Sequence, residues 1–259
     1  MDLGIGGRTA IICASSRGLG KACAQALARE GVNVVVNGRD AGRLRDTAET
    51  IKQGCKVDVK AVQADVTTAE GRAALLSACP EPDILINNNA GPPPKNFLEI
   101  EPGDWATALD ANMVAALELT RAVVPAMKQR RFGRIINITS AMVSTPRGHM
   151  SLSSGARAGL TAVMKGLSID LAKHNITINN MLPERIDTDR QRFMADREMK
   201  ANGITYEEAR ARQVASIPAG RLGDPREFGA TCAFLCSVHA GFTTGMNVHL
   251  DGGAYPALL

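Results

Sequence analysis

Hydroxyl, imidazole and guanidinium groups follow one another within a short stretch of this sequence. Ser140 comes directly after a segment of strand length, residues 134–138, and His149, Ser153 and Arg157 come next. A serine hydroxyl can hydrogen-bond a carbonyl oxygen, and a guanidinium holds negative charge without releasing its proton. His149 is the one side chain of this loop that normally titrates near neutral pH. The stretch therefore contains groups that can polarise a carbonyl compound.

A carboxylate follows the next segment of strand length. Residues 176–182 form this segment, and Glu184 and Arg185 come after it, separated from it by one proline. Glu184 is therefore a second candidate proton carrier beside Ser140. Two alternatives stay open, a structural ion pair between Glu184 and Arg185 and an exposed loop position for His149.

The elements that must position these groups alternate along the whole chain. Strands are predicted at residues 9–13, 33–36, 57–63, 83–87, 134–138, 176–182 and 247–250, and helices at residues 19–30, 40–53, 69–78, 102–130, from about 151, within 188–213, and at 225–237. Strands separated by helix-length connections predict an α/β fold with a parallel sheet covered on both faces. Ligands of such sheets bind at the carboxyl ends of the strands, which is where Ser140 lies.

Composition excludes several classes of protein. The 259 residues are 45% hydrophobic with no polar linker, which predicts a single domain spanning residues 1–259. A net charge of +4 from 30 basic and 26 acidic residues, with 3% aromatics, argues against nucleic acid as a partner. No long apolar run or leader-like start is visible, so we expect a cytoplasmic protein that does not span a membrane. The six cysteines form no CxxC pair, and we expect buried thiols and no metal site.

The turn after the first strand has the composition of a phosphate-binding loop. Ser15, Arg17, Gly18, Leu19 and Gly20 stand between that strand and the next helix. Glycines there let the backbone approach a pyrophosphate, and the helix N-terminus supplies free amide donors. Two glycines alone are also compatible with a tight turn that binds nothing.

The end of the second strand indicates which dinucleotide fits. A carboxylate at this place would bind the ribose 2′-hydroxyl, but the sequence has Arg39, whose guanidinium can hold a 2′-phosphate, as can Arg17. The sequence therefore favours NADP over NAD, the alternative being that Arg39 is an ordinary surface charge.

Two further strand ends supply residues for the adenine and the ribose. Asp65 and Val66 follow the third strand, and Asn89, Ala90 and Gly91 follow the fourth. All five are predicted to bind the cofactor, because they lie at the same edge of the sheet as the glycine turn.

Together these segments make the chain resemble the short-chain dehydrogenase/reductase family, especially its branch like β-ketoacyl-acyl-carrier-protein reductase. The resemblance covers nearly the whole chain. It is carried by the glycine turn, Asp65-Val66, Asn88 to Gly91, Asn112, Ser140, Thr188, Gly220-Arg221-Leu222-Gly223 and Asp251-Gly252-Gly253.

The resemblance implies a Rossmann-type doubly wound sheet of about seven strands and a nicotinamide cofactor. It implies that Asn112 positions a water, that Ser140 hydrogen-bonds the substrate carbonyl and that Thr188 contacts the cofactor. Residues 188–215 are expected to form a lid over a small-molecule substrate. A homotetramer or homodimer is the expected assembly.

The chain departs from the family pattern where the chemistry takes place. The family has a catalytic Tyr thirteen residues after the active-site Ser, and a Lys four residues later, whereas this chain has Ser153 and Arg157. A serine hydroxyl is far less acidic than a phenol, and Arg157 can bind the nicotinamide ribose but cannot pass a proton.

The leading hypothesis is an NADP-dependent short-chain oxidoreductase that acts on a carbonyl or alcohol substrate, with a 3-oxoacyl thioester as one candidate. Its proton donor is nonstandard, with Ser153, His149 and Glu184 as the nearby groups. A catalytically degenerate cofactor-binding sensor or structural subunit is the alternative. A turn that no longer binds dinucleotide is the third hypothesis.

Overall fold

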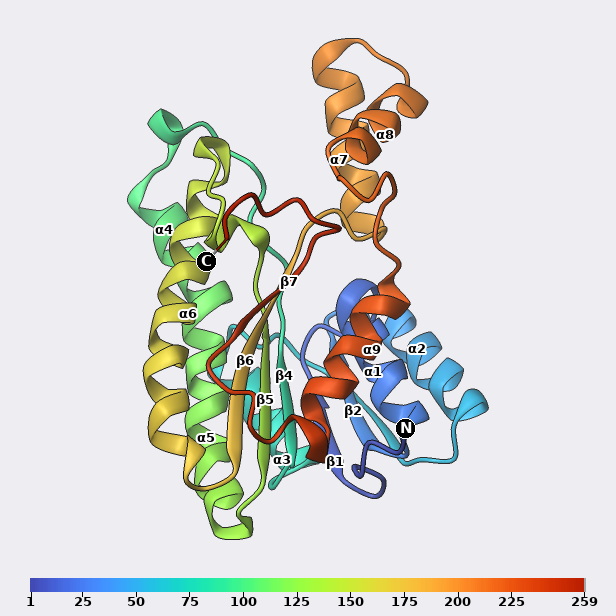
Figure 1. Cartoon of the computed structure of the whole chain (residues 1–259), viewed down its shortest axis with the longest axis vertical. Coiled ribbons are helices and arrows are strands. Elements are labelled where there is room, and N and C mark those ends of the chain that lie inside the picture. The colour runs from blue at the N-terminus through green and yellow to red at the C-terminus, as the bar shows by residue number, and fades with distance from the viewer. Residues whose placement is uncertain (259) are drawn as a thin grey trace.

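The chain forms one seven-stranded parallel sheet, seen in a computed structural model that describes residues 1–258 (Figure 1). The strand order is β3-β2-β1-β4-β5-β6-β7. The strands are β1 Thr9–Ile12, β2 Asn33–Gly38, β3 Val59–Gln63, β4 Ile84–Asn87, β5 Gly133–Ile138, β6 Ile176–Pro183 and β7 Asn247–Leu250. This doubly wound α/β sheet of the Rossmann type confirms the predicted fold class.

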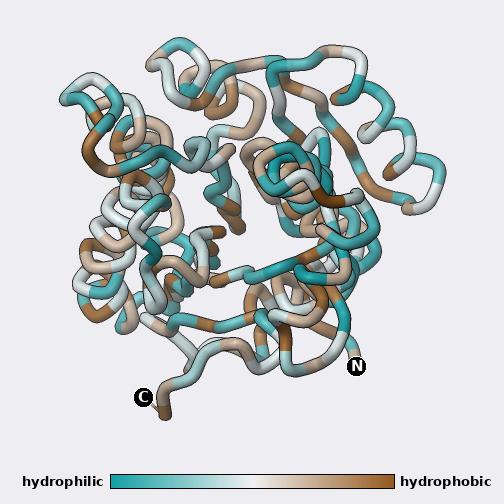
Figure 2. The backbone as a smooth tube through the Cα atoms, turned by 90° about the horizontal axis from the view of Figure 1, so that it is seen from above, coloured by the Kyte–Doolittle hydropathy of each residue, from teal (hydrophilic) through white to brown (hydrophobic). Residues whose placement is uncertain are grey.

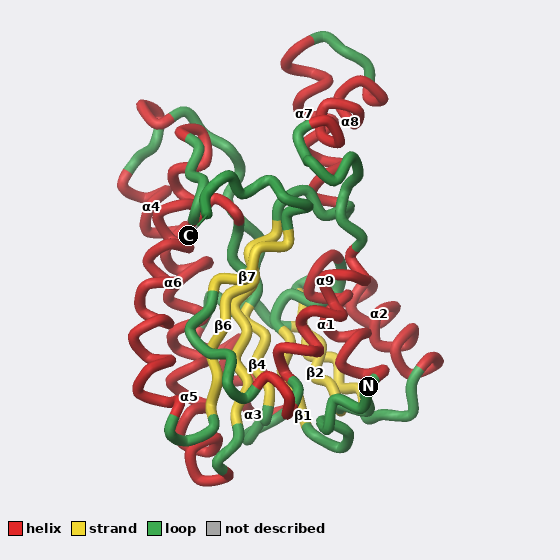
Figure 3. Tube along the Cα trace, viewed as in Figure 1, coloured by secondary structure: helices red, strands yellow, loops and turns green. Residues whose placement is uncertain are grey.

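Helices cover both faces of the sheet, in two layers (Figures 1 and 3). One layer contains α1 Gly18–Arg29, α2 Ala41–Gly54 and α9 Pro225–Cys236, and the other contains α3 Ala69–Ala78, α5 Ala115–Arg130 and α6 Ser151–Ala172. Seen from above, the helices carry hydrophilic and hydrophobic positions within the same turns (Figure 2), as expected when one side packs on a sheet.

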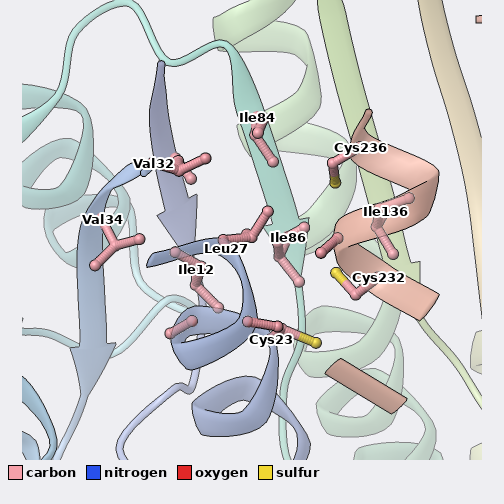
Figure 4. Close-up of a cluster of buried hydrophobic side chains, with 14 of the residues drawn as sticks. Ile12, Cys23, Leu27, Val32, Val34, Ile84, Ile86, Ile136, Cys232 and Cys236 are labelled. Atoms are coloured by element: carbon pink, nitrogen blue, oxygen red, sulfur yellow. The ribbon is translucent and has the colours of Figure 1, made fainter. Parts of the chain in front are cut away.

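The apolar side chains of each layer form a separate core against the sheet. Figure 4 shows the core beneath α1 and α9, where Cys23 of α1 and Cys232 of α9 point toward each other. All six cysteines are free, and five of them are buried. The predicted buried thiols are therefore confirmed except at Cys55, which is half-buried.

The order of the strands creates a crevice between β1 and β4. Connections from β1 run outward through β2 and β3, whereas those from β4 run outward in the other direction. The loops after β1 and β4 therefore diverge to opposite faces of the sheet, and ligands of open α/β sheets bind at this switch point. The glycine turn follows β1, and the segment Asn88 to Gly91 follows β4.

A row of four asparagines, three of them buried, fixes the register of the other half of the sheet. Asn87, Asn137, Asn180 and Asn247 are aligned partners on β4, β5, β6 and β7. Each side-chain amide nitrogen donates to the side-chain oxygen of the next asparagine, at 2.9 Å in all three cases. Asn87 also donates to the Thr120 hydroxyl of α5, at 3.3 Å. A slip by one residue would turn these amides to the other face and leave them unpaired.

One long helix predicted from the sequence is interrupted. The prediction placed a helix over residues 102–130, but the structure has α4 Pro102–Leu109, a wider π-helical turn Asp110–Val114, and α5. The pattern of apolar residues continues across the interruption, so the sequence period alone could not reveal it. Such turns insert an extra residue into the helical repeat and are frequent at functional sites.

A pair of helices projects beyond the carboxyl ends of the strands (Figure 1). They are α7 Asp189–Asn202 and α8 Tyr206–Ala215, and they correspond to the predicted lid at residues 188–215. Thr205 and Glu208 form a capping box at the start of α8. No helix within residues 1–258 is both long and apolar enough to cross a membrane.

The asparagine row makes a stability prediction. Asn137→Ala removes two buried hydrogen bonds. It leaves one N–H of the Asn87 amide, which keeps its bond to Thr120, and the oxygen of Asn180 without these partners. Each unpaired buried group costs about 1–3 kcal/mol, so we expect the free energy of unfolding in urea to fall by about 2–4 kcal/mol.

Asn247→Ala is the matched control, because Asn247 ends the row at an exposed position. Its loss leaves only one group, the side-chain amide of Asn180, without its partner. We expect a loss below about 1.5 kcal/mol. Equal losses for the two variants would show that the row does not stabilise the sheet as a unit.

Candidate active site

The glycine turn leaves the N-terminus of α1 open to a ligand. Arg17 precedes the helix in an extended conformation, and its side chain makes no capping hydrogen bond. Gly18 has a φ of +56°, which favours glycine, and a Cβ on Gly20 would lie 2.5 Å from the Ala14 carbonyl oxygen. The first amides of α1 therefore face the crevice without a protein partner for an incoming phosphate.

Ser15 has a structural place within this turn. Its side chain is fully buried, donates to the Ile12 carbonyl at 2.8 Å and accepts from the Asn37 amide at 2.9 Å. Ser16, which the sequence reasoning did not select, is more accessible. A Cβ built on Gly38 would lie 2.8 Å from the Ser16 hydroxyl, so this hydroxyl sits against the end of β2.

Arg39 and Asp65 meet at the outer end of the crevice. The guanidinium of Arg39 is 71% exposed and lies 3.5 Å from the Asp65 carboxylate. Asp65 also accepts from the amide and hydroxyl of Thr67, and these bonds, with the charge of Arg39, hold the pKa of Asp65 below its usual value. Arg39 is thus fixed at the end of β2 with most of its donors still free for an anion. Val66, beside Asp65, is buried.

The segment after β4 crosses the floor of the crevice. The side-chain amide of Asn89 donates to the Ala111 carbonyl at 3.0 Å, and Ala90 is exposed. A Cβ on Gly91 would lie 3.4 Å from the guanidinium of Arg157. The structure therefore brings Asn89 to Gly91 together with Arg157, as the sequence predicts.

Arg157 lies under this segment and is 7% exposed. Its guanidinium donates to the carbonyls of Ile138 at 2.7 Å and Thr139 at 2.9 Å, and more weakly to that of Asn89 at 3.4 Å. Burial, with a smaller contribution from the charge of Arg190, lowers the pKa of Arg157 to about 10. The side chain thus ties the ends of β4 and β5 together and keeps a positive charge beneath the crevice.

A small cavity lies between Asn112, Asn87 and Arg157. Its volume is about 20 Å³, enough for one water. The side-chain oxygens of Asn112 and Asn87 and the Nε of Arg157 are buried and have no partner among the described residues. One water could donate to both oxygens and accept from Nε, which satisfies all three groups. The π-helical turn presents Asn112 to this cavity.

Ser140 and Ser153 flank the end of β5. The hydroxyl of Ser140 accepts from the Met142 amide at 3.2 Å, which leaves its proton available to a ligand, and the residue is half-buried. Ser153 is 4% exposed in the first turn of α6. Neither can act as an acid near neutral pH.

The other two proton carriers lie on the outer side of this loop. His149 is exposed, and its backbone carbonyl accepts from the Lys95 amide. The Glu184 side chain is 11% exposed and lies 3.4 Å from Arg147 and 3.5 Å from Arg185. Glu184 therefore forms the ion pair with Arg185 that was the alternative to a catalytic role. His149 lies in an exposed loop, which was the alternative for this residue.

The first residues after β6 bridge the crevice from above. Thr188 lies against Gly18, since a Cβ built on this glycine would be 3.9 Å from the threonine side chain, and Asp189 lies 3.6 Å from Arg17. Arg190, which the sequence reasoning missed, donates to the Pro92 carbonyl at 3.1 Å. Only the fold brings this arginine to the loop after β4, because 98 positions separate the two residues in the sequence.

The residues around the crevice fit a nicotinamide dinucleotide. An open helix N-terminus, an arginine at the end of β2 and partly exposed polar groups after β3 and β4 lie along one edge of the sheet. The fold and site thus define a dinucleotide-binding protein of the Rossmann class.

Residues 13–255 match the family described as enoyl-(acyl carrier protein) reductase. The chain belongs to this family of short-chain dehydrogenases/reductases and is an oxidoreductase.

Individual relatives cover the chain almost completely. The NADPH-dependent reductase BacG of Bacillus subtilis is 33% identical over 256 residues, 97% of this chain and 99% of its own length. The 3-oxoacyl-[acyl-carrier-protein] reductase FabG of Escherichia coli is 32% identical over 254 residues, 96% of this chain and 98% of its own length. The crystal structure of L-sorbose reductase from Gluconobacter frateurii, complexed with NADPH and L-sorbose, has a TM-score of 0.94 and 31% identity, with 100% of both chains covered.

The glycine turn gives a binding prediction. In Gly20→Ala, the added Cβ meets the Ala14 carbonyl oxygen, so the turn must shift. We expect NADPH to bind at least about tenfold more weakly in a fluorescence titration, because a displaced turn loses amide bonds to phosphate.

Gly54→Ala is the control for this variant. Its added Cβ meets nothing within 4 Å, so NADPH affinity should not change. Circular dichroism must show that both variants are folded. A folded Gly20→Ala variant with the affinity of the wild type would disprove the assignment of this turn.

Proposed function

We propose that this protein is an NADP-dependent reductase of small carbonyl compounds. The observation that carries the proposal is that Arg157 bonds the Thr139 carbonyl, next to Ser140 in the chain, and lines the same small cavity as Asn112. Relatives described as NADPH-dependent or as 3-oxoacyl reductases support the same reaction class. A 3-oxoacyl thioester is one candidate substrate.

The preference for NADP follows from the charges at the end of β2. The guanidinium of Arg39 is largely exposed there, and Arg17 is 59% exposed on the adjacent turn. Ser16 adds a hydroxyl between them. A 2′-phosphate would meet two cations, each of which has one carboxylate partner here, Asp65 for Arg39 and Asp189 for Arg17.

Each site residue then has a role that its position allows. The bound nicotinamide supplies a hydride. Ser140 donates a hydrogen bond to the substrate carbonyl, and Arg157 places a positive charge under the nicotinamide ribose. Asn112 and Asn87 hold a water in the small cavity. Thr188 closes the crevice against Gly18.

Proton supply is the unusual part of the proposed reaction. The hydroxyl of Ser153 stands where the related enzymes are expected to have a phenol, and it cannot deliver a proton at a useful rate. His149 and Glu184 are the candidate groups that can. Substrate binding would have to bring one of them to the carbonyl beside Ser140.

We further propose that α7 and α8 act as a lid and that the protein is a cytoplasmic homotetramer or homodimer. Their projection beyond the sheet supports the lid. Free cysteines are consistent with a reducing compartment. Apolar side chains exposed on α6 and near the C-terminus support self-association: Val163, Ile169, Phe234, Phe242 and Met246.

The function is tested by following NADPH absorbance with a panel of ketones, sugars and 3-oxoacyl thioesters. We expect the protein to reduce at least one of these compounds. With that substrate, the KM for NADPH should be lower than the KM for NADH, because Arg39 contacts the 2′-phosphate. Arg39→Ala should remove this preference. Tight NADPH binding without turnover of any compound would instead favour the cofactor-binding sensor.

The proton donor is tested by His149→Gln and Glu184→Gln. Loss of a general acid lowers kcat by about 10²–10⁴, and we expect this loss in one variant only. Thr107→Ala, on the exposed face of α4, is a control that should leave kcat unchanged. Full activity in both active-site variants would exclude both candidates.

A further inference from the structure

Two guanidinium groups flank the loop after β4. Arg157 lies beneath it, with one nitrogen 3.4 Å from the Asn89 carbonyl. Arg190 reaches it from α7 and donates to the Pro92 carbonyl at 3.1 Å. Gly91 lies between these two contacts, and a Cβ built on it would also lie 3.4 Å from Arg157. Both charges therefore border the nicotinamide side of the crevice.

Neither of these arginines has a carboxylate partner. Among the described residues no Asp or Glu oxygen lies within 4 Å of Arg157 or Arg190, whereas Arg17, Arg39 and Arg185 each have one. The Nε of Arg157 belongs to the small cavity described above, so the nitrogen that Arg157 offers to an anion is the one 3.4 Å from the Asn89 carbonyl. Burial lowers the pKa of both groups, and a neighbouring arginine adds to the effect in each case.

Two like charges in a half-buried crevice are unfavourable unless an anion joins them. Removing a cation from water costs several kcal/mol that hydrogen bonds to neutral carbonyls recover only in part. An oxyanion placed between the two would accept charge-assisted hydrogen bonds from free guanidinium nitrogens and screen their repulsion. In this structure the two guanidinium groups contact neutral carbonyls and, for Arg190, the ring of Phe193 at 5.8 Å, and a negative ligand would add the missing opposite charge.

We propose that Arg190, supported by Arg157, binds an oxyanion on the nicotinamide side of the crevice and thereby selects anionic ligands. This inference rests on the proposed function, since it concerns the same crevice. Two ligands could supply the oxyanion: an oxo-acid substrate, through its carboxylate, and the cofactor, through its diphosphate. In either case Arg190, which already joins the first turn of α7 to the loop after β4 through the Pro92 carbonyl, is a binding residue.

The experiment measures binding without requiring turnover. Isothermal titration of NADP⁺ into wild-type protein and Arg190→Gln gives the cofactor affinity. Acetoacetate and its methyl ester are then titrated into each NADP⁺ complex, where no hydride is available. Arg226→Gln, which removes an 80% exposed arginine of α9, controls for the change in net charge.

If the anion is a substrate carboxylate, the wild-type protein binds acetoacetate more tightly than the ester. Arg190→Gln then lowers the affinity for acetoacetate at least about tenfold and leaves the affinity for the ester unchanged. If it is the diphosphate, Arg190→Gln weakens NADP⁺ by a similar factor instead. The proposal is overturned if Arg190→Gln changes neither affinity, or if Arg226→Gln changes them equally. Because no step needs catalysis, a protein that reduces nothing still gives a decisive result.

Discussion

The hydrogen-bonded row of asparagines across β4, β5, β6 and β7 is the constraint on which the site depends. It fixes the register of four parallel strands, and the loops that follow β4, β5 and β6 carry the segment near Gly91, Ser140 and Glu184. The row also reaches the site directly. Its inner end, the oxygen of Asn87, opens into the same cavity as Asn112 and Arg157. Sheet register and the proposed water site are thus parts of one polar network.

Arg157 shows how a buried guanidinium can hold strand ends together without supplying a proton. A guanidinium has several donors in a fixed plane, and here two or three of them are used on strand-end carbonyls. The charge remains beneath the crevice, but it cannot relay a proton. Together with Ser153, it leaves the reaction dependent on groups at the rim or on solvent. A carbonyl reductase without a nearby general acid benefits from a substrate whose own charge helps to orient it. Arg190 is the residue proposed here to bind that charge.

The predicted strands and helices agree with the structure where the local pattern is unambiguous. The helix Ala69–Ala78 and the strand Asn247–Leu250 have the predicted bounds, and the glycine turn follows β1 at the carboxyl edge of the sheet. The interruption at Asn112 could not be predicted, because a π-helical turn is decided by packing against neighbouring helices. Ser15 was assigned to the cofactor by its position, but whether its hydroxyl faces the ligand or the protein depends on Asn37 of another strand.

The sequence by itself determined the fold class, the edge of the sheet that holds the site and the absence of a phenol at position 153. These depend on residue type, strand–helix alternation and short-range turns, which are local properties of the chain. Only the tertiary structure decided that Asn87 and Asn112 share a cavity, that Glu184 is held by Arg147 and Arg185, and that Arg190 reaches Pro92. Each of these depends on distances between segments far apart in the sequence, and long-range packing sets those distances.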